Sequence, residues 1–275
     1  MRIAFIDHHL NNYHANTFLK LLREEGAEVA ACWESHPDGD DWAAKNSVSR
    51  ADSIEDAVNA ADATMLLAPD NIERHLDLCR VVLPFGKPTF IDKMLAFETR
   101  EAEEIVALAA EHKTPIMSGS ALRCAVEFEA FEGREQPEEA FGRGMGKLFG
   151  YGIHTLSMVQ RLMGVGVRRV IDTGTENCRL IALDYGDRRA FVELRTADNL
   201  WDSLSWQMGA KYSGEYVTEV VKDFAGFYRN QALSMLDFFE TGRSPWPIEE
   251  SLEAVKIHQA AEQSRREGGA WVGLK

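Results

Sequence analysis

The sequence has no glycine-rich turn at the place where its first segments call for one. The first apolar run, RIAFID, leads through a turn into an amphipathic segment, yet no glycine occurs between Phe5 and Leu22. A dinucleotide-binding turn normally reads G-x-G-x-x-G, because bare backbone has to approach the pyrophosphate closely. The turn carries polar residues instead: His8, His9, Asn11, Asn12 and His14. They indicate a cofactor site rebuilt with polar side chains, a metal site or a lost site.

Cysteines, basic residues and long apolar runs are also scarce, and each shortage excludes a class of protein. Cys32, Cys79, Cys124 and Cys178 are widely spaced without a CxxC pair, so neither a zinc knuckle nor a disulfide framework is predicted, and we expect a reduced, cytoplasmic setting. The net charge of -14 argues against nucleic acid or an anionic membrane as a partner. No apolar stretch approaches the roughly 20 residues that span a bilayer, and no secretory signal is expected.

Short apolar runs alternate with helical patterns over residues 1–120. The runs are RIAFID, EVAACWE, ATMLLAP, PTFIDK and PIMSG. Between them, apolar residues recur at helical spacing at Ala15, Phe18, Leu19 and Leu22, and at Ala102, Ile105, Val106 and Ala109. This rhythm predicts an α/β fold with a parallel, doubly wound sheet.

Residues 121–275 follow a different pattern, typical of a mostly antiparallel sheet with helices. The stretch 127–147 is rich in Glu and Gly and is predicted to be a loop. We predict strands in RRVIDTGT, in a hairpin over 178–195 and within 202–221, and helices over 154–163, 223–241 and 249–267, before a final WVGL.

Residues that directly follow the predicted strands are candidates for a binding site, because ligands of an open α/β sheet bind beyond the carboxyl ends of its strands. They are Asp7, His8, His9, Glu34, Pro69, Asp70, Asn71, Asp92, Lys93, Ser118, Gly119 and Ser120. Glu34 is placed to hold a ribose 2'-hydroxyl, which favours NAD over NADP; it is otherwise a solvated strand-end carboxylate. Lys93 can hold a substrate oxygen, with Asp92 tuning its charge, or form a structural ion pair.

Two histidines in the second half invite different interpretations. His154 stands at a predicted helix start and is a natural base for a hydroxyl proton, although it can equally cap or pack. His258 shares an apolar helical stripe with Ala254, Ile257 and Ala261, which predicts a core or interface residue.

The histidines of the first turn admit a metal interpretation. His8, His9 and His14, with Asp7, offer metal-ligating groups. Adjacent residues of a strand point to opposite sides, and no HxH or HExxH pattern is present. We therefore favour a crevice-lining or helix-capping role for these polar side chains, and predict no metal.

The central string LAPDNIERHLDLCRVVLPFGKPTFIDKMLAFETREAEEIVALA resembles the glucose-fructose oxidoreductase/inositol dehydrogenase (Gfo/Idh/MocA) family. That family reads approximately T-P-N-x-x-H, then G-K-H-V-x-x-E-K-P-L-A, then T-x-x-E-A. The matching residues are Pro69, Asn71, His75, Gly86, Lys87, Lys93, Leu95, Ala96, Thr99 and Ala102. The segment YGIHTLSMVQRLMG is similar to the family's G-x-H-x-x-D-x-x-x-x-L-x-G, and PIEESLEAVKIHQAAEQSRREGGAWVGL to its closing helix and strand.

The chain departs from that family at positions of its chemistry. E-K-P has become Asp92-Lys93-Met94. Gly150 and Ser157 stand where acids commonly flank the histidine. The resemblance nevertheless covers nearly the whole chain, most weakly at 125–147 and 196–222.

The resemblance implies a Rossmann-type dinucleotide-binding domain over 1–120 and a C-terminal substrate and oligomerisation domain over 121–275. It implies NAD or NADP as cofactor, a sugar, polyol or related substrate, and hydride transfer assisted by Lys93 and His154, with Tyr151 as a stand-in donor. The cofactor-binding residues that we predict are His8, Asn11, Asn12, Glu34, Pro69, Asn71, His75, Asp92 and Lys93. Arg123 and His154 are the predicted substrate-binding residues.

The leading hypothesis is therefore an NAD(P)-dependent oxidoreductase that acts on a hydroxylated small molecule. A non-catalytic family member, serving as a ligand or cofactor sensor or as an assembly subunit, is the alternative, and a metal-dependent hydrolase at the turn histidines is a minor one. We expect a homo-oligomer, a dimer or tetramer, because Trp201, Trp206 and Met208 are expected near an exposed sheet face.

Overall fold

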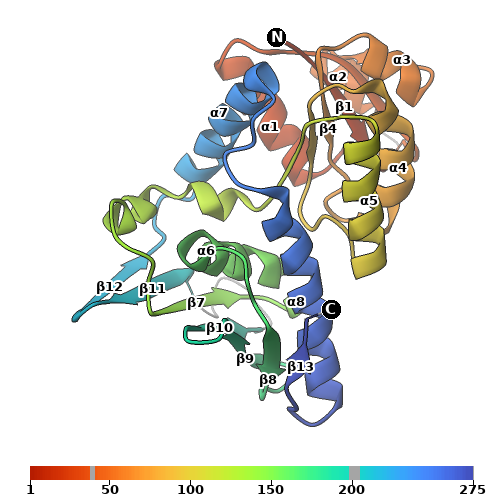
Figure 1. The fold of residues 1–275 in the computed structure, drawn as a ribbon. Coiled ribbons are helices and arrows are strands. Elements are labelled where there is room, and N and C mark those ends of the chain that lie inside the picture. The colour runs from red at the N-terminus through yellow and green to blue at the C-terminus, as the bar shows by residue number, and fades with distance from the viewer. Residues whose placement is uncertain (38–40, 198–204, 275) are drawn as a thin grey trace. The chain divides into compact units, whose positions relative to one another are not determined.

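The computed structural model describes residues 1–37, 41–197 and 205–274 and divides into two compact units (Figure 1). The first unit comprises Met1–Gly119 and Tyr228–Ser251. The second comprises Ser120–Phe227 and the chain from Leu252 onward. The first unit is thus assembled from two separate stretches of sequence.

A parallel sheet of six strands forms the centre of the first unit, as predicted. Its strands are β1 (Arg2–Asp7), β2 (Glu28–Glu34), β3 (Ser49–Arg50), β4 (Ala63–Leu66), β5 (Thr89–Ile91) and β6 (Ile116–Ser118). Their order is β3-β2-β1-β4-β5-β6, and every described pair is parallel. The order reverses between β1 and β4, so their carboxyl ends flank the topological switch point, where ligands of such sheets bind.

Helices cover both faces of this sheet. They are α1 (Tyr13–Glu24), α2 (Trp42–Asn46), α3 (Ile54–Asn59), α4 (His75–Val82), α5 (Thr99–Glu111) and α7 (Gly226–Thr241), with 3-10 turns at Ile72–Arg74 and Leu83–Phe85. Figure 1 shows α4 and α5 side by side on one face and α1 and α7 on the other. The predicted apolar stripe of α1 is buried, and that of α5 is buried except for Val106, which is half-buried. The apolar periodicity therefore predicted correctly which faces pack on the sheet.

A mostly antiparallel sheet of seven strands forms the second unit. Its strands are β7 (Glu139–Met145), β8 (Arg169–Asp172), β9 (Cys178–Asp184), β10 (Arg189–Arg195), β11 (Gln207–Tyr212), β12 (Glu215–Val220) and β13 (Val272–Gly273). They are ordered β12-β11-β7-β10-β9-β8-β13, and the β7–β10 pair is parallel. The predicted hairpin over 178–195 is confirmed as β9 and β10.

The prediction of a loop over 127–147 is wrong, because β7 lies within it and pairs with both β10 and β11. The glycines that suggest a loop serve close packing. A Cβ at Gly142 would lie 2.8 Å from Val159 Cγ2, and one at Gly144 would meet the Oγ1 of Thr155. Glycine in this strand therefore lets the helix α6 (Ile153–Met163) approach the sheet.

The remaining helices of the second unit agree with expectation. The predicted helices over 154–163 and 249–267 correspond to α6 and to α8 (Ile248–Arg266). Shorter turns occupy Ala121–Cys124, Val126–Phe131 and Leu148–Gly152. His258 on α8 is fully buried, which confirms its predicted place in the core.

The side chains of Trp206 and Met208 at β11, which we expect near an exposed sheet face, are buried. Trp206 and Met208 are 5% and 0% exposed, because both side chains point into the unit, and Trp201 lies outside the described residues. Large side chains that this sheet exposes include Leu180, Phe191 and Tyr216.

Candidate active site

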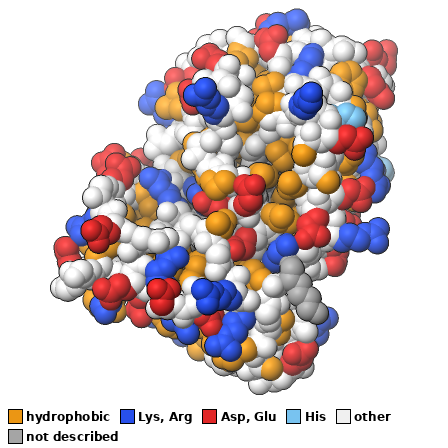
Figure 2. Space-filling view, viewed as in Figure 1, with side chains coloured by type: hydrophobic (Ala, Val, Ile, Leu, Met, Phe, Trp, Pro, Cys, Tyr) orange, Lys and Arg blue, Asp and Glu red, His pale blue; other side chains and the backbone are white. Residues whose placement is uncertain are grey.

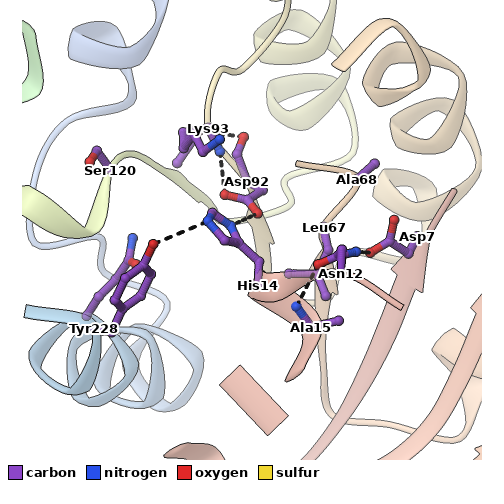
Figure 3. Close-up of polar contacts among 12 residues, drawn as sticks. Asp7, Asn12, His14, Ala15, Leu67, Ala68, Asp92, Lys93, Ser120 and Tyr228 are labelled. Carbon is purple, nitrogen blue, oxygen red and sulfur yellow. Dashed lines mark hydrogen bonds and ion pairs between the residues drawn. The ribbon is translucent and has the colours of Figure 1, made fainter. Parts of the chain in front are cut away.

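The loop after β1 is held together by its own polar side chains (Figure 3). Asp7 accepts hydrogen bonds from the backbone N–H of His9 (3.0 Å) and from Nδ2 of Asn12 (2.9 Å). Asn12 in turn caps α1, because its Oδ1 accepts from the N–H of Ala15 at 2.9 Å. The predicted capping role of this turn is confirmed for Asn12, whereas Asn11 is exposed.

Burial changes the protonation of Asp7. The side chain is nearly inaccessible to solvent, and the loss of hydration raises its pKa to about 7. The negative charge of Asp92 raises it further, while the hydrogen bonds from His9 and Asn12 lower it. Asp7 therefore changes charge near neutral pH.

Glu34 closes the same loop from the end of β2. Its Oε2 accepts a hydrogen bond from the N–H of Leu10 at 2.8 Å, and its Oε1 pairs with Arg50 at 2.8 Å. Arg50 also pairs with Asp41 at 2.9 Å. Only 1% of the Glu34 side chain is exposed. Both carboxylate oxygens are thus bound within the protein, and a ribose hydroxyl could reach Glu34 only if one of these bonds opened.

The histidines of the turn have three different partners. His8 Nδ1 lies 2.7 Å from Ser35 Oγ, and burial together with the charges of His36 and Arg74 lowers the pKa of His8. His9 Nδ1 lies 3.0 Å from the carbonyl oxygen of His36, whereas His14 turns toward β5. Among residues 1–37, 41–197 and 205–274, no cluster of three metal-ligating side chains occurs. The metal-site alternative therefore lacks its proposed ligand set.

Ionisable groups gather at the carboxyl end of β5. Asp92 is 1% exposed; its Oδ2 lies 2.5 Å from Nδ1 of His14, and its Oδ1 accepts the N–H of Lys93 at 2.7 Å. Burial by itself would raise the pKa of Asp92, but the charges and hydrogen bonds of His14 and Lys93 outweigh it and hold the pKa below its ordinary value. Lys93 is itself 8% exposed. Lys93 thus contacts Asp92 through its backbone N–H, and its charge acts on the carboxylate.

The hydroxyl of Tyr228 on α7 completes this set. It lies 3.4 Å from Nε2 of His14, with the two rings edge to face at 5.9 Å (Figure 3). The sequence does not reveal this contact, because Tyr228 and His14 are 214 residues apart. The only local signal is that His14 precedes Phe18 by one helical turn, on the face of α1 that packs against the sheet.

Three further residues of the predicted cofactor site shape the loop after β4. His75 is fully buried, and its ring nitrogens lie 3.0 Å from the Leu67 carbonyl oxygen and 3.2 Å from that of Leu95. It therefore ties the loops after β4 and β5 together and does not reach an open surface. Pro69 is buried and Asn71 half-buried, with the Asn71 amide donating to Glu73 at 3.2 Å.

His154 is the centre of the polar set in the second unit. Its Nδ1 lies 2.7 Å from Oγ of Ser120, and the rings of Tyr151 and Trp206 stand edge to face with it at 5.6 and 5.8 Å. Tyr151 is 38% exposed, whereas Arg123 is 6% exposed and donates to the carbonyl oxygen of Ser157 at 3.4 Å. His154 and Tyr151 thus lie together, while Arg123 is bound to the protein backbone.

Comparison with known proteins identifies the fold. No family model and no curated protein matches the sequence. A probable dehydrogenase from Thermotoga maritima is similar in structure, with a TM-score of 0.84 and 15% identity over 100% of this chain and 99% of that chain. A putative myo-inositol dehydrogenase from Sinorhizobium meliloti 1021 is similar with a TM-score of 0.80 and 15% identity, over 100% of both chains. An oxidoreductase from Agrobacterium radiobacter, in complex with NAD+, L-tartaric acid and magnesium, is similar with a TM-score of 0.81 and 13% identity. The match covers 100% of this chain and 98% of that chain.

These likenesses confirm the fold that the sequence motifs imply. The chain has the two-sheet fold of solved dehydrogenases along its whole length. At identities of 13% to 15%, the similarity concerns the fold, and the chemistry has to be argued from the residues of this chain.

The donors of the loop after β1 determine whether it can hold a dinucleotide. Pyrophosphate binds to backbone amides at the end of the first strand and the start of the first helix. Here the amides of His9 and Leu10 are bound to the carboxylates of Asp7 and Glu34. In this arrangement these two amides are not available to a pyrophosphate, and the carboxylates of Asp7 and Glu34 that hold them lie where its charge would be. The end of β5 carries Lys93, whose ammonium is a hydrogen-bond donor.

Proposed function

We propose that the protein is an oxidoreductase that acts on a hydroxylated small molecule such as a sugar or polyol. The observation that carries the proposal is the buried set of Asp92, Lys93 and His14 at the carboxyl end of β5. A lysine next to a buried carboxylate can hold a reacting oxygen, and an imidazole can accept or return its proton. The dehydrogenase fold supports the same reaction class.

The roles of individual side chains follow from their chemistry. In this proposal Lys93 donates a hydrogen bond to the reacting oxygen. His154, whose Nδ1 lies 2.7 Å from Oγ of Ser120, is the candidate acid–base group of the second unit, and the exposed Tyr151 is a further donor there. Arg123 remains a predicted substrate-binding residue. Its guanidinium donates to the carbonyl oxygen of Ser157, so it would act by positioning that backbone.

A nicotinamide dinucleotide is the redox partner that we propose, with NAD favoured over NADP. The NAD+ complex of a similar structure supports the cofactor class. Glu34 and Asp41 place two carboxylates beyond β2, where an additional 2'-phosphate would be repelled. Binding requires that the loop after β1 release its amides from Asp7 and Glu34, so we expect weak affinity.

Nicotinamide binding tests this proposal most directly. Titration calorimetry with NADH and with NADPH should show binding in the millimolar range or tighter, and turnover is then tested with myo-inositol and related polyols. Lys93→Ala should abolish turnover while leaving cofactor binding within a few-fold, whereas Lys20→Ala, at an exposed position of α1, should change neither. Absence of binding of both nicotinamides would overturn the dehydrogenase proposal.

One observation favours a second function. The closed loop after β1 suits a member of this fold that binds a small hydroxylated ligand without a dinucleotide, as a sensor or assembly subunit. In that case a polyol would bind, as measured by tryptophan fluorescence, while neither nicotinamide does. The same titrations thus separate the two functions.

We also propose that the protein is a cytoplasmic homo-oligomer. Leu180 and Phe191 are 46% and 43% exposed on the outward face of the second sheet, and exposed apolar side chains of this kind favour association. No helix within residues 1–37, 41–197 and 205–274 is long and apolar enough to cross a membrane. Figure 2 shows acidic and basic side chains interspersed over much of the visible face, and the net charge of -14 disfavours nucleic acid as a partner.

A further inference from the structure

A carboxylate, an imidazole and a phenol are linked in series inside the first unit. Asp92 contacts Nδ1 of His14 at 2.5 Å, and the Tyr228 hydroxyl lies 3.4 Å from Nε2 of the same ring. The three side chains come from the end of β5, from α1 and from α7 (Figure 3). The imidazole therefore has one nitrogen toward an acceptor and the other toward a hydroxyl.

This placement fixes the tautomer of the neutral ring. An ionised carboxylate only accepts hydrogen bonds, so the Nδ1 that faces Asp92 carries the hydrogen. The Nε2 atom is then free of hydrogen and accepts from the Tyr228 hydroxyl. Proton exchange at His14 consequently takes place on the side of Tyr228.

The surroundings favour proton exchange over a purely structural tie. The ring centroids of Phe18 and Tyr13 lie 6.0 and 5.6 Å from that of Tyr228, and the Phe18 ring also packs edge to face with His14. Charge-bearing hydrogen bonds are stronger in such apolar surroundings than in water. His14 is 9% exposed and Tyr228 is half-buried, so Tyr228 is the member of the series with the largest share of exposed surface. Titratable groups around the imidazole include Asp92, Tyr13 and Tyr228, and the charges of Lys93 and Asp7 act on Asp92.

We propose that Asp92, His14 and Tyr228 form one acid–base unit, in which Tyr228 exchanges a proton with a substrate hydroxyl and His14 takes up the proton that Tyr228 releases. The unit deepens the proposed function and rests on it, because the substrate is taken to carry a hydroxyl. Tyr228 is the group that touches substrate, and His14 and Asp92 act through it.

The proton transfer balances without a further reactant. The substrate O–H bond and the Tyr228 O–H bond break, while a new O–H bond forms on Tyr228 and an N–H bond forms at Nε2 of His14. The substrate is left as an alkoxide and the imidazole as an imidazolium, 2.5 Å from the Asp92 carboxylate that stabilises it. The reverse transfer returns a proton to the alkoxide.

The first test needs only the protein labelled with 15N in its histidines. We expect the nitrogen spectrum at pH 8 to show His14 with Nδ1 protonated and Nε2 free of hydrogen. The His14 signals are assigned as those that disappear in His14→Gln. Tyr228→Phe should shift the Nε2 resonance, because the hydroxyl is removed. Tyr13→Phe, on the same aromatic cluster, should leave it unchanged. A hydrogen on Nε2 in the wild type, or an Nε2 resonance insensitive to Tyr228→Phe, would overturn the inference, and the wild-type spectrum decides even if a variant does not fold.

Turnover of myo-inositol with NAD provides the second test. Tyr228→Phe and His14→Gln should each lower kcat by about 100-fold with KM within a few-fold, and the double variant should be no slower than the worse single one. Unchanged kcat in Tyr228→Phe, with an active wild type, would overturn the inference. If the wild type shows the expected tautomer and resonance shift but no turnover, the proposed function fails on its substrate or cofactor, and the acid–base unit stands.

Discussion

Asp7 shows how a single buried carboxyl can link the stability of the first unit to pH. Asp7 accepts hydrogen bonds from His9 and Asn12, yet the loss of hydration outweighs them and its pKa rises to about 7. A carboxyl whose pKa is raised by folding binds its proton more tightly in the folded protein. Its stabilising contribution is therefore full below the unfolded value of 3.8 and is lost as the pH rises to about 7.

Replacing Asp7 by Asn should remove this pH dependence. We expect the free energy of unfolding of Asp7→Asn, relative to wild type, to increase by a few kcal/mol between the ordinary carboxyl pKa of 3.8 and about pH 7, and to level off above it. Urea denaturation at a series of pH values measures this difference. Asp70→Asn, at an exposed position, is the matched control and should show no such trend. Parallel curves for Asp7→Asn and wild type would contradict the prediction.

Glu34 should determine how strongly the first unit repels a dinucleotide. Its carboxylate holds the amide of Leu10, and it is a like charge to any pyrophosphate bound there. Glu34→Gln should tighten NADH binding by about tenfold, since one such repulsion is worth on the order of 1.4 kcal/mol. Asp41→Asn removes the other partner of Arg50 from an exposed position and should change the affinity by less. Calorimetry measures both; equal effects would show that Glu34 does not face the phosphates.

The chemistry of single positions could be predicted from sequence more readily than their partners. The polar residues after β1, β2 and β5 were identified, because strand ends are recognisable locally. Their contacts were not: His14 and Asp92 are 78 residues apart, and Glu34 and Arg50 lie on different strands. A one-dimensional pattern carries no information on such pairs.

At the scale of elements, local signals predicted helices better than strands. The helix α1 follows from a capping Asn12 and one apolar stripe, both of which lie within a few residues of each other. The sequence does not predict the strand β7, because its glycines allow the helix α6 to pack closely and do not mark a turn. Whether glycine marks a loop or a close contact depends on what packs against it, which only tertiary structure shows.

Gly144→Ala tests this interpretation of β7. The added Cβ would meet the Thr155 hydroxyl of α6 and lie 2.9 Å from Cδ1 of Trp206, so we expect a loss of about 1–3 kcal/mol of unfolding free energy. Thr155→Ala in the same protein should recover part of the loss, because Oγ1 of Thr155 has no hydrogen-bond partner among the described residues and its removal makes room. Denaturant unfolding of the four proteins of this cycle measures the coupling. Strictly additive losses would contradict the close contact.

At the scale of the whole molecule, the outward face of the second sheet should determine the oligomeric state. Replacing both Leu180 and Phe191 by Lys should convert the proposed dimer or tetramer to a smaller species, because two exposed apolar side chains of that face become charged. Light scattering after size exclusion measures the mass. Val165→Lys replaces a side chain of similar exposure in the loop after α6 and should leave the mass unchanged. A wild-type monomer would contradict the proposal.

The divided sequence of the first unit has a consequence for how the protein is made. The late segment Tyr228–Ser251 contributes Gln231, which donates to the carbonyl oxygen of Gly119 at 2.9 Å, and Trp246, which donates to that of Ser118 at 2.7 Å. During synthesis on the ribosome, the carbonyl groups at the end of β6 therefore lack these donors until residues 120–227 of the second unit have been made. The first unit is completed almost last, and a fragment that ends at residue 119 should need the late segment, fused or added as a peptide, to reach its native stability.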